Sequence, residues 1–276
     1  MQLEILRAIQ SLANPVLDVL FEAFTMLGEQ IVLALVFCTV YWCFNKQLGK
    51  FLIGTLCASL CLNGLLKDIF RAPRPIGEPG IISRRTQTAT GYSFPSGHAQ
   101  SAAAFWSALA LWLRKHWFSV TAALLIAAVC LSRLYLGVHY PLDVLGGTLC
   151  GTAVSVGFYL LMRKTKGYHA LFAVGAVITA LSLLLGSSDD TLGAMGMLAG
   201  AFVGCLLEER LVNFSTGTSL PRKLLRLGVG LAVIGLLYIL PKILLPHTAF
   251  WSALHYALIA FAACGGYPWI FSKLRF

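Results

Sequence analysis

The sequence has few charged residues, and this scarcity excludes an ordinary soluble domain. Only 12% of its 276 residues are Asp, Glu, Lys or Arg, whereas a soluble domain usually carries about a quarter. Hydrophobic residues make up 58%, and the mean hydropathy is +0.79. Several apolar stretches approach the roughly 20 residues that a helix needs to cross a bilayer. We therefore expect the chain to be embedded in a membrane.

Other common signals are also missing. The eight cysteines include no Cys-x-x-Cys pair and nearly all lie in apolar stretches, where cysteine behaves as a small hydrophobic residue. We expect neither disulfides nor metal ligation from them. The start of the chain has no basic region followed by an uninterrupted apolar core, so no cleavable signal peptide is expected. No linker, low-complexity tract or clear internal repeat divides the sequence, which indicates a single helical domain.

The apolar stretches predict an all-α fold, a polytopic transmembrane helical bundle of about nine spans. The expected spans are residues 30–44, 50–70, 98–113, 117–133, 141–162, 168–187, 191–207, 224–245 and 249–271. Charges and Asn14-Pro15 interrupt residues 1–28, for which we expect two short helices along the membrane interface, with a degenerate first span as the alternative. The expected units are thus residues 1–28, a core over 29–167 that holds the polar motifs, and additional transmembrane helices over 168–276.

The net charge of +10 is spread in a way that indicates orientation rather than nucleic-acid binding. One group of cations lies in short loops: Lys46, Lys50, Arg114, Lys115, Arg163, Lys164, Lys166, Arg222, Lys223, Lys273 and Arg275. Because every second loop carries this excess, the positive-inside rule places these loops in the cytoplasm. A second group lies on the other side, where the rule disfavours cations: Lys67, Arg71, Arg74, Arg84, Arg85 and Arg133. A bound anion would explain the second group.

A histidine and an aspartate near the start of the fifth span carry nucleophilic chemistry. His139 and Asp143 are four residues apart and share one side of a helix that begins near Pro141. A carboxylate bonded to one imidazole nitrogen fixes the tautomer and leaves the other nitrogen free as a nucleophile. Arg133, six residues earlier, can place a planar guanidinium against phosphate oxygens.

Residues 95–98, Pro-Ser-Gly-His, form a second polar patch at the start of an apolar stretch. Ser96 is suited to cap the following helix. The backbone N–H groups of Ser96, Gly97 and His98 would then point at an anion, and His98 adds a proton donor. The alternative is an ordinary capped helix with an incidental histidine.

A third patch places two cations at the end of another apolar stretch. Lys67 precedes Arg74 by seven residues, and prolines flank Arg74 on both sides, which holds that segment extended. Cations near bilayer depth cost roughly 2.5–3.5 kcal/mol each on insertion scales, and a phosphate dianion would offset this cost. The polar loop over 76–93, which follows, either lines a substrate entrance or is a plain connector.

In order and spacing, the three patches resemble the signature of the type 2 phosphatidic acid phosphatase superfamily. That signature is Lys, six residues and Arg-Pro; then Pro-Ser-Gly-His; then Ser-Arg, five residues, His, three residues and Asp. The sequence matches every fixed position, and the resemblance covers roughly residues 50–163. The family core is usually six helices, so the helices after residue 168 lie beyond it.

The resemblance implies a membrane-embedded lipid phosphate phosphatase. By that resemblance His139 attacks phosphorus to give a phosphohistidine, Asp143 orients it, and His98 protonates the leaving oxygen and then activates water. The substrate-binding residues would be Lys67, Arg74, Ser96, Gly97 and Arg133. The family reaction needs no metal and no cofactor. The substrate would be a phosphomonoester or diphosphate on a lipid, in the plasma membrane of a bacterium, with the site on the extracytoplasmic side.

Two other functions stay open at this stage. The first is a lipid phosphotransferase that uses the same phosphohistidine, and the second is a non-enzymatic lipid transporter or scaffold.

Two features outside the motifs also have two interpretations. Gly196, Gly200 and Gly204 recur at four-residue spacing, as do Gly147 and Gly151, which indicates close helix packing within the monomer or, alternatively, a homodimer. Asp189 and Asp190 read as a solvated turn rather than a cation site.

Overall fold

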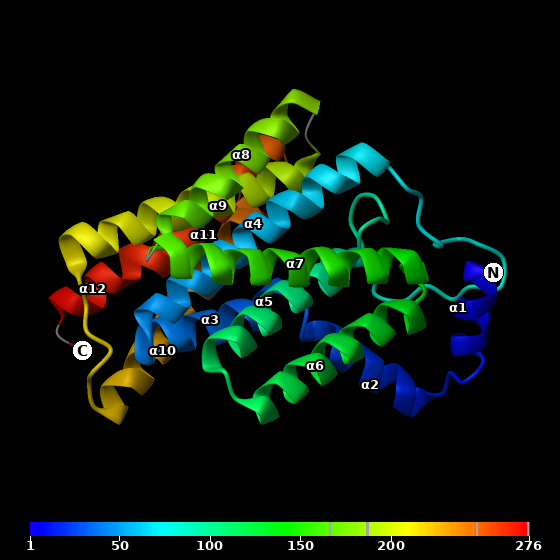
Figure 1. The fold of residues 1–276 in the computed structure, drawn as a ribbon, viewed down its shortest axis with the longest axis horizontal. Coiled ribbons are helices and arrows are strands. Elements are labelled where there is room, and N and C mark those ends of the chain that lie inside the picture. Colours follow the sequence, from blue (N-terminus) through cyan, green and yellow to red (C-terminus); the bar gives the residue numbers. More distant parts are fainter. Residues whose placement is uncertain (166, 186–187, 245, 247, 275) are drawn as a thin grey trace.

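The computed structural model describes residues 1–165, 167–185, 188–244, 246, 248–274 and 276, and all regular structure within them is helical (Figure 1). The helices are α1 (Gln2–Gln10), α2 (Pro15–Met26), α3 (Gln30–Cys43), α4 (Lys46–Phe70), η1 (Thr86–Thr88), α5 (Gly97–Leu113), α6 (His116–Tyr135), α7 (Pro141–Thr165), α8 (His169–Leu185), α9 (Asp189–Leu207), η2 (Glu208–Val212), α10 (Leu220–Leu244), α11 (Ala249–Phe261), η3 (Ala262–Gly266) and α12 (Tyr267–Lys273). The prediction of an all-α fold is confirmed for the described residues. Within residues 1–28 the chain forms the two short helices α1 and α2.

Each predicted span corresponds to a helix, but nine membrane crossings are not confirmed. Six helical segments of the described chain are long and apolar enough to cross: α4, α6, α7, α9 with η2, α10, and α11 with its continuation. A seventh arises if α2 and α3, bent by 49° at their junction, count as one span. Helix length explains part of the difference between nine and six, because α5 and α8 have only 17 residues each. Residues 186, 187 and 245, at the ends of two predicted spans, lie outside the described residues, as do Lys166 and Arg275.

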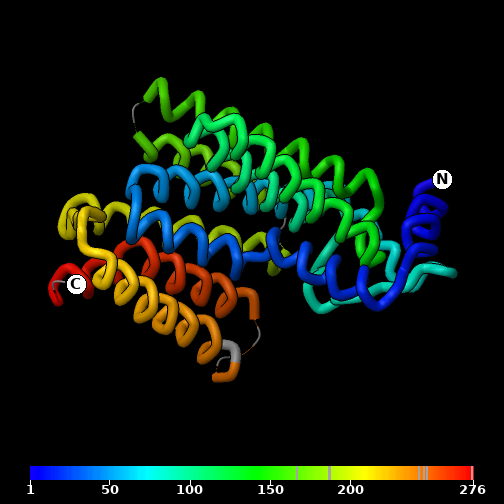
Figure 2. The backbone as a smooth tube through the Cα atoms, turned by 90° about the horizontal axis from the view of Figure 1, so that it is seen from below, coloured from blue at the N-terminus to red at the C-terminus, as the bar shows by residue number. Residues whose placement is uncertain are grey.

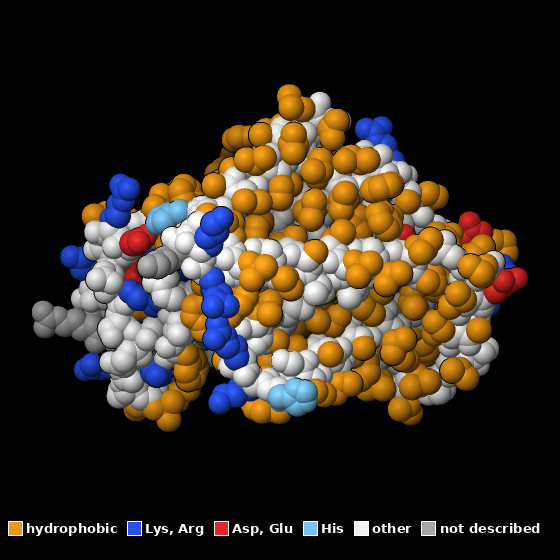
Figure 3. All heavy atoms as spheres, in the orientation of Figure 1, with side chains coloured by type: hydrophobic (Ala, Val, Ile, Leu, Met, Phe, Trp, Pro, Cys, Tyr) orange, Lys and Arg blue, Asp and Glu red, His pale blue; other side chains and the backbone are white. Residues whose placement is uncertain are grey.

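The two ends of the bundle differ in the loops that they carry. In Figure 1 the α5–α6 turn, the end of α7 and the start of α10 lie toward the left, whereas the long α4–α5 loop and the α6–α7 turn lie toward the right. Hydrophobic side chains cover most of the middle of this face, and Lys and Arg side chains gather toward the left (Figure 3). This distribution suits a bundle whose middle faces lipid.

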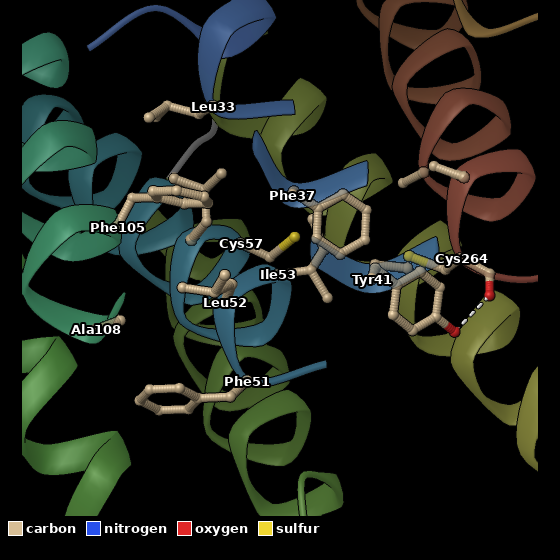
Figure 4. Close-up of a cluster of buried hydrophobic side chains, with 14 of the residues drawn as sticks. Leu33, Phe37, Tyr41, Phe51, Leu52, Ile53, Cys57, Phe105, Ala108 and Cys264 are labelled. Atoms are coloured by element: carbon tan, nitrogen blue, oxygen red, sulfur yellow. Dashed lines mark hydrogen bonds between the residues drawn. The ribbon is translucent and has the colours of Figure 1, made fainter. Parts of the chain in front are cut away.

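Helix α4 is the centre of the bundle. Of an apolar stretch of 18 residues in α4, 89% is buried inside the protein, whereas only 11% of the corresponding stretch of α10 is buried. It packs against α3, α5, α7, α8 and α9. Phe51, Leu52, Ile53 and Cys57 of α4 lie between side chains of α3 and α5 (Figure 4). Figure 2 shows α3 and α4 between α5–α7 on one side and α10–α11 on the other.

The C-terminal helices are fastened to the core by hydrogen bonds at a π-helical turn. The Tyr41 hydroxyl donates to the Cys264 carbonyl oxygen at 2.8 Å (Figure 4), and the Trp42 indole N–H donates to that of Ala263 at 2.9 Å. The turn η3 leaves backbone carbonyls available for side-chain donors. At the same end of the bundle, buried Glu208 pairs with Lys46 at 2.8 Å and Lys50 at 3.0 Å. Hydrogen bonds and buried ion pairs thus connect the C-terminal helices to α3 and α4.

The recurring glycines serve packing inside the chain. A Cβ atom built on Gly196 would lie 2.0 Å from the Ala253 carbonyl oxygen, and one on Gly200 would lie 2.0 Å from that of Ala257. Both glycines therefore let α9 and α11 approach closely. The interpretation as packing within the monomer is confirmed for these two positions.

Alanine at Gly151 is expected to destabilise the protein. Its added Cβ would lie 2.3 Å from the Gln100 carbonyl oxygen and 2.9 Å from the Ala104 backbone nitrogen, so α5 and α7 would have to move apart. We expect a loss of about 1–3 kcal/mol, as for overpacked cores, read as a lower Tm in detergent. Gly157→Ala, on the same helix with no heavy atom within 4 Å of its Cβ in the described chain, is the matched control and should leave the Tm equal or slightly raised. An equal drop in both variants would contradict the packing argument.

Candidate active site

The three polar motifs meet at one cavity of about 410 Å³. Lys67 comes from the last turn of α4, Arg74 from the loop after it, Gly97 and His98 from the first turn of α5, and His139 from the α6–α7 turn; all five line the cavity. Three other residues of the same motifs, Ser96, Arg133 and Asp143, are buried and do not line this cavity. Distant stretches of chain therefore bring their cations and imidazoles to one place, as expected.

His139 is held between an acid and an arginine. Its Nδ1 lies 3.5 Å from Asp143 Oδ2 and 3.4 Å from the Ser93 hydroxyl. Asp143, in the first turn of α7, also accepts hydrogen bonds from the Tyr140 backbone N–H at 2.8 Å and from Ser93 at 2.5 Å. A carboxylate is favoured at this position because it satisfies an N–H group at the helix N-terminus. The helix start thus fixes the carboxylate beside the imidazole.

Arg74 is bound mainly to backbone carbonyls. Its guanidinium donates to the carbonyl oxygens of Thr90, Gly91, Tyr92 and Val138 at 2.5–3.1 Å. One of its nitrogens, Nη1, also lies 3.0 Å from His139 Nε2. Since an arginine can only donate, Nε2 presents its lone pair toward Arg74 and the proton resides on Nδ1. The Arg74 side chain therefore links the long α4–α5 loop to the imidazole of His139.

The surroundings of His139 keep its ring neutral. Burial, followed by the positive charges of Arg74 and Arg133, lowers the pKa of His139 well below its ordinary value near 6.5. A neutral imidazole is the form that can act as a nucleophile.

Ser96 stands at the N-cap position of α5, but its hydrogen bonds differ from those predicted. Its side chain makes no cap hydrogen bond, and its backbone N–H donates to the Asp143 carbonyl oxygen at 2.9 Å. The expectation that this N–H points at an anion is therefore wrong. The physical reason is the close approach of α7, since a Cβ on Gly147 would lie only 2.6 Å from the Ser96 carbonyl oxygen.

Four buried polar side-chain atoms of the motifs have no hydrogen-bond partner within the described part of the chain: Ser96 Oγ, His98 Nε2, Arg133 Nε and Arg133 Nη2. The Arg133 side chain is fully buried, and its remaining nitrogen donates to Thr25 Oγ1 at 2.8 Å. Buried polar groups are nearly always satisfied, so an unsatisfied cluster needs an explanation. An oxyanion with several acceptor oxygens is the group that would satisfy these donors.

Several residues of the site carry no motif signal in the sequence. Glu29, at the bend between α2 and α3, lies 3.8 Å from His98 Nε2 and pairs with Arg85. Asn63 on α4 donates to the Pro95 carbonyl oxygen at 3.1 Å and to Gln100 at 2.9 Å, and so holds the start of α5. The scarcity of acids in an apolar background is the only feature that sets Glu29 apart in the sequence.

Lys67 contacts Asp190, a residue that the sequence analysis places in a solvated turn. Its ammonium lies 3.2 Å from the Thr90 carbonyl oxygen and 3.3 Å from Asp190 Oδ2. The interpretation of Asp190 as part of a solvated turn is therefore wrong. Gln87, Thr88 and Thr90 also line the cavity, so the long loop contributes to the wall of the site rather than being a plain connector.

Comparisons with known proteins agree with this geometry. The sequence model of the PAP2 superfamily matches residues 48–167, and that of the PAP2 superfamily phosphatase transmembrane extension matches residues 192–276. The chain is 31% identical to the "Putative undecaprenyl-diphosphatase YbjG" of Escherichia coli, over 47% of this chain and 69% of that protein. It is 30% identical to sphingosine-1-phosphate phosphatase 1 of mouse, over 65% of this chain and 43% of that protein. The matched region thus spans less than half of the mouse protein.

Among solved structures, the transmembrane PAP2-type phosphatidylglycerolphosphate phosphatase of Bacillus subtilis is similar, with a TM-score of 0.50 and 25% identity over 58% of this chain and 84% of that one. The chain belongs to the PAP2 superfamily, the type 2 phosphatidic acid phosphatases, and carries that superfamily's transmembrane extension.

Proposed function

We propose that the protein is a lipid phosphatase that hydrolyses a phosphomonoester or diphosphate through a phosphohistidine on His139, without a metal ion. The observation that carries the proposal is the cluster of buried donors without partners, Ser96 Oγ, His98 Nε2 and two nitrogens of Arg133, beside an imidazole held neutral. Donors that are fixed in advance and already free of water can stabilise charge that develops on a phosphoryl group.

The reaction follows from the placement of the groups. Arg74 Nη1 moves from His139 Nε2 to a phosphoryl oxygen, the freed Nε2 lone pair attacks phosphorus, and the bond from phosphorus to the ester or anhydride oxygen breaks. His98, which takes up a proton once the phosphate anion lies beside it, gives its Nε2 proton to that leaving oxygen. Water then attacks the phosphohistidine and loses a proton to His98, and the phosphorus–nitrogen bond breaks. Inorganic phosphate and a neutral His139 are restored, with Asp143 orienting the ring throughout.

The relatives support a lipid as the carrier of the phosphate. Their names describe phosphatases of a sphingoid phosphate, of a polyprenyl diphosphate and of a glycerophospholipid phosphate. The site lies at the end of the bundle opposite the basic loops, which supports an extracytoplasmic site. The location that we propose is the plasma membrane of a bacterium.

Phosphate release from vesicles tests the proposal. The purified full chain is reconstituted and given phosphatidic acid, sphingosine 1-phosphate, phosphatidylglycerol phosphate or undecaprenyl diphosphate, each with and without EDTA and with vanadate. We expect phosphate release from at least one lipid, unaffected by EDTA and inhibited by vanadate. Transfer of the phosphoryl group to an added alcohol without phosphate release would indicate a phosphotransferase, and no reaction with any lipid would overturn the enzymatic proposal.

The pH dependence of the reaction should report the charge around His139. Because a neighbouring cation lowers the pKa of His139, removing one by Arg74→Gln should raise that pKa. The imidazole would then take up its proton at a higher pH, so the acid limb of kcat/KM should move to higher pH than in the wild type. Using the same substrate for both proteins cancels the ionisation of the substrate itself. A limb that stays in place or moves to lower pH would contradict the assignment, and Arg84→Gln is the control.

A further inference from the structure

The C-terminal helices supply a wall of the candidate active site. Asp190, Gly193 and Met197 of α9, and Ser252 and Tyr256 of α11, line the same cavity as Lys67 and His98. These residues lie outside the motifs that carry the phosphate chemistry. The extension is therefore in a position to contact the part of a substrate that lies next to the phosphate.

Asp190 is held firmly at the mouth of the phosphate site. The next residue, Thr191, donates from its hydroxyl to Asp68 Oδ2 of α4 at 2.8 Å, and the Ser188 N–H donates to the same oxygen at 3.2 Å. The Thr90 hydroxyl donates to both carboxylate oxygens of Asp190 at 3.0–3.1 Å. These bonds fix the start of α9 against α4, so the carboxylate stays close to Lys67.

A carboxylate in that place conflicts with a site for phosphate alone. Asp190 Oδ2 lies 3.3 Å from Lys67 Nζ, and the Asp190 side chain is 37% exposed while that of Lys67 is 8% exposed. A phosphate dianion bound to Lys67 would come near a second anion, and like charges at short range disfavour binding. A ligand that brings its own positive charge would remove this conflict, because the charge could sit against Asp190.

An aromatic ring completes the surroundings of such a charge. Gly193 is three residues after Asp190, on the same side of α9, and a Cβ atom there would lie 3.1 Å from the Tyr256 ring. The absence of a side chain at Gly193 therefore lets the Tyr256 ring lie against α9 one turn below the carboxylate. Carboxylates and aromatic faces together are the usual surroundings of a bound ammonium group.

We propose that Asp190 is a specificity-determining residue that binds a protonated amine close to the phosphate of the substrate. The preferred substrate class is then a lipid phosphomonoester with a primary ammonium separated from the phosphate by a short carbon spacer. This inference rests on the proposed phosphatase function and adds the substrate class to it.

The test compares two lipids that differ in the amine. Sphingosine 1-phosphate carries a protonated amine, whereas ceramide 1-phosphate has the same phosphate and an uncharged amide at that position. In the wild type kcat/KM should be higher for sphingosine 1-phosphate. Asp190→Asn should lower kcat/KM for sphingosine 1-phosphate by about 10- to 100-fold, the effect of losing a hydrogen bond to a charged group, and should not lower it for ceramide 1-phosphate.

Each outcome separates the alternatives. Glu4→Gln removes the negative charge of an exposed residue of α1 that is not part of the cavity wall, and should leave the ratio of the two kcat/KM values unchanged. If Asp190→Asn changes both substrates by the same factor, Asp190 only holds Lys67 and the inference is overturned. If neither lipid releases phosphate in the wild type or in the variants, while other lipids in the panel do, the amine preference alone fails. If no lipid is hydrolysed, the proposed function itself fails.

Discussion

Replacing His139 by alanine is expected to lower phosphate release by about 10⁴-fold or more, because the nucleophile that forms the covalent intermediate is gone. The imidazole is buried, its pKa is lowered well below the ordinary value by burial and neighbouring cations, and its Nδ1 lies 3.5 Å from Asp143 Oδ2. Initial rates of phosphate release from lipid vesicles measure the loss, with the amount of folded protein matched by size-exclusion chromatography.

A matched histidine and a covalent label provide the controls. His116→Ala removes an exposed histidine at the start of α6, at the end of the bundle away from the cavity, and should keep the wild-type rate within about threefold, as for surface substitutions. After an acid-free quench with labelled substrate, the wild type should carry a label on histidine and His139→Ala should carry none. Retention of more than a tenth of the rate in His139→Ala would contradict the phosphohistidine mechanism.

The helices were predictable because they depend on local sequence. An apolar stretch in lipid has to satisfy its own backbone hydrogen bonds, and a helix does so within one segment. Residues such as Pro141, at the first position of a helix, mark the boundaries in the same way. The number of membrane crossings is harder to predict from the sequence. It depends on whether helices of 17 residues, such as α5, are long enough to cross the membrane, and on whether α2 and α3 form one bent span.

The motif residues of the site were predictable because their spacing is itself informative, while their partners were not. Lys67 and Asp190 are separated by 123 positions, and Arg133 and Thr25 by 108. Such contacts depend on how helices pack, and nothing in the sequence near Asp190 or Glu29 indicates them. The bend at Gly28 shows the same limit, since a Cβ there would lie 2.8 Å from the His98 carbonyl oxygen. The break between α2 and α3 thus makes room for α5, which lies 70 residues further along the chain.

The arrangement around Arg133 favours the binding of an anion and lowers the stability of the protein when no anion is bound. A buried guanidinium with two nitrogens unpartnered in the described chain loses its hydration without full compensation. Replacing a buried charge by an apolar group of similar length is often neutral or stabilising. Stability and activity should therefore respond in opposite directions to a change at this residue.

Arg133→Met is the variant that separates the two effects. Phosphate release, measured as kcat/KM, should fall by about 10²- to 10³-fold, the loss typical of removing one donor that stabilises transition-state charge. The Tm in detergent should stay at or above the wild-type value, and inhibition by vanadate should weaken, because the anion loses two donors. Arg84→Met is the matched control, since Arg84 is 38% exposed and pairs with Asp18 at 2.9 Å, and a surface ion pair contributes about 0–1 kcal/mol. A large drop in Tm in Arg133→Met together with unchanged vanadate inhibition would show that Arg133 supports the fold and does not bind the phosphoryl group.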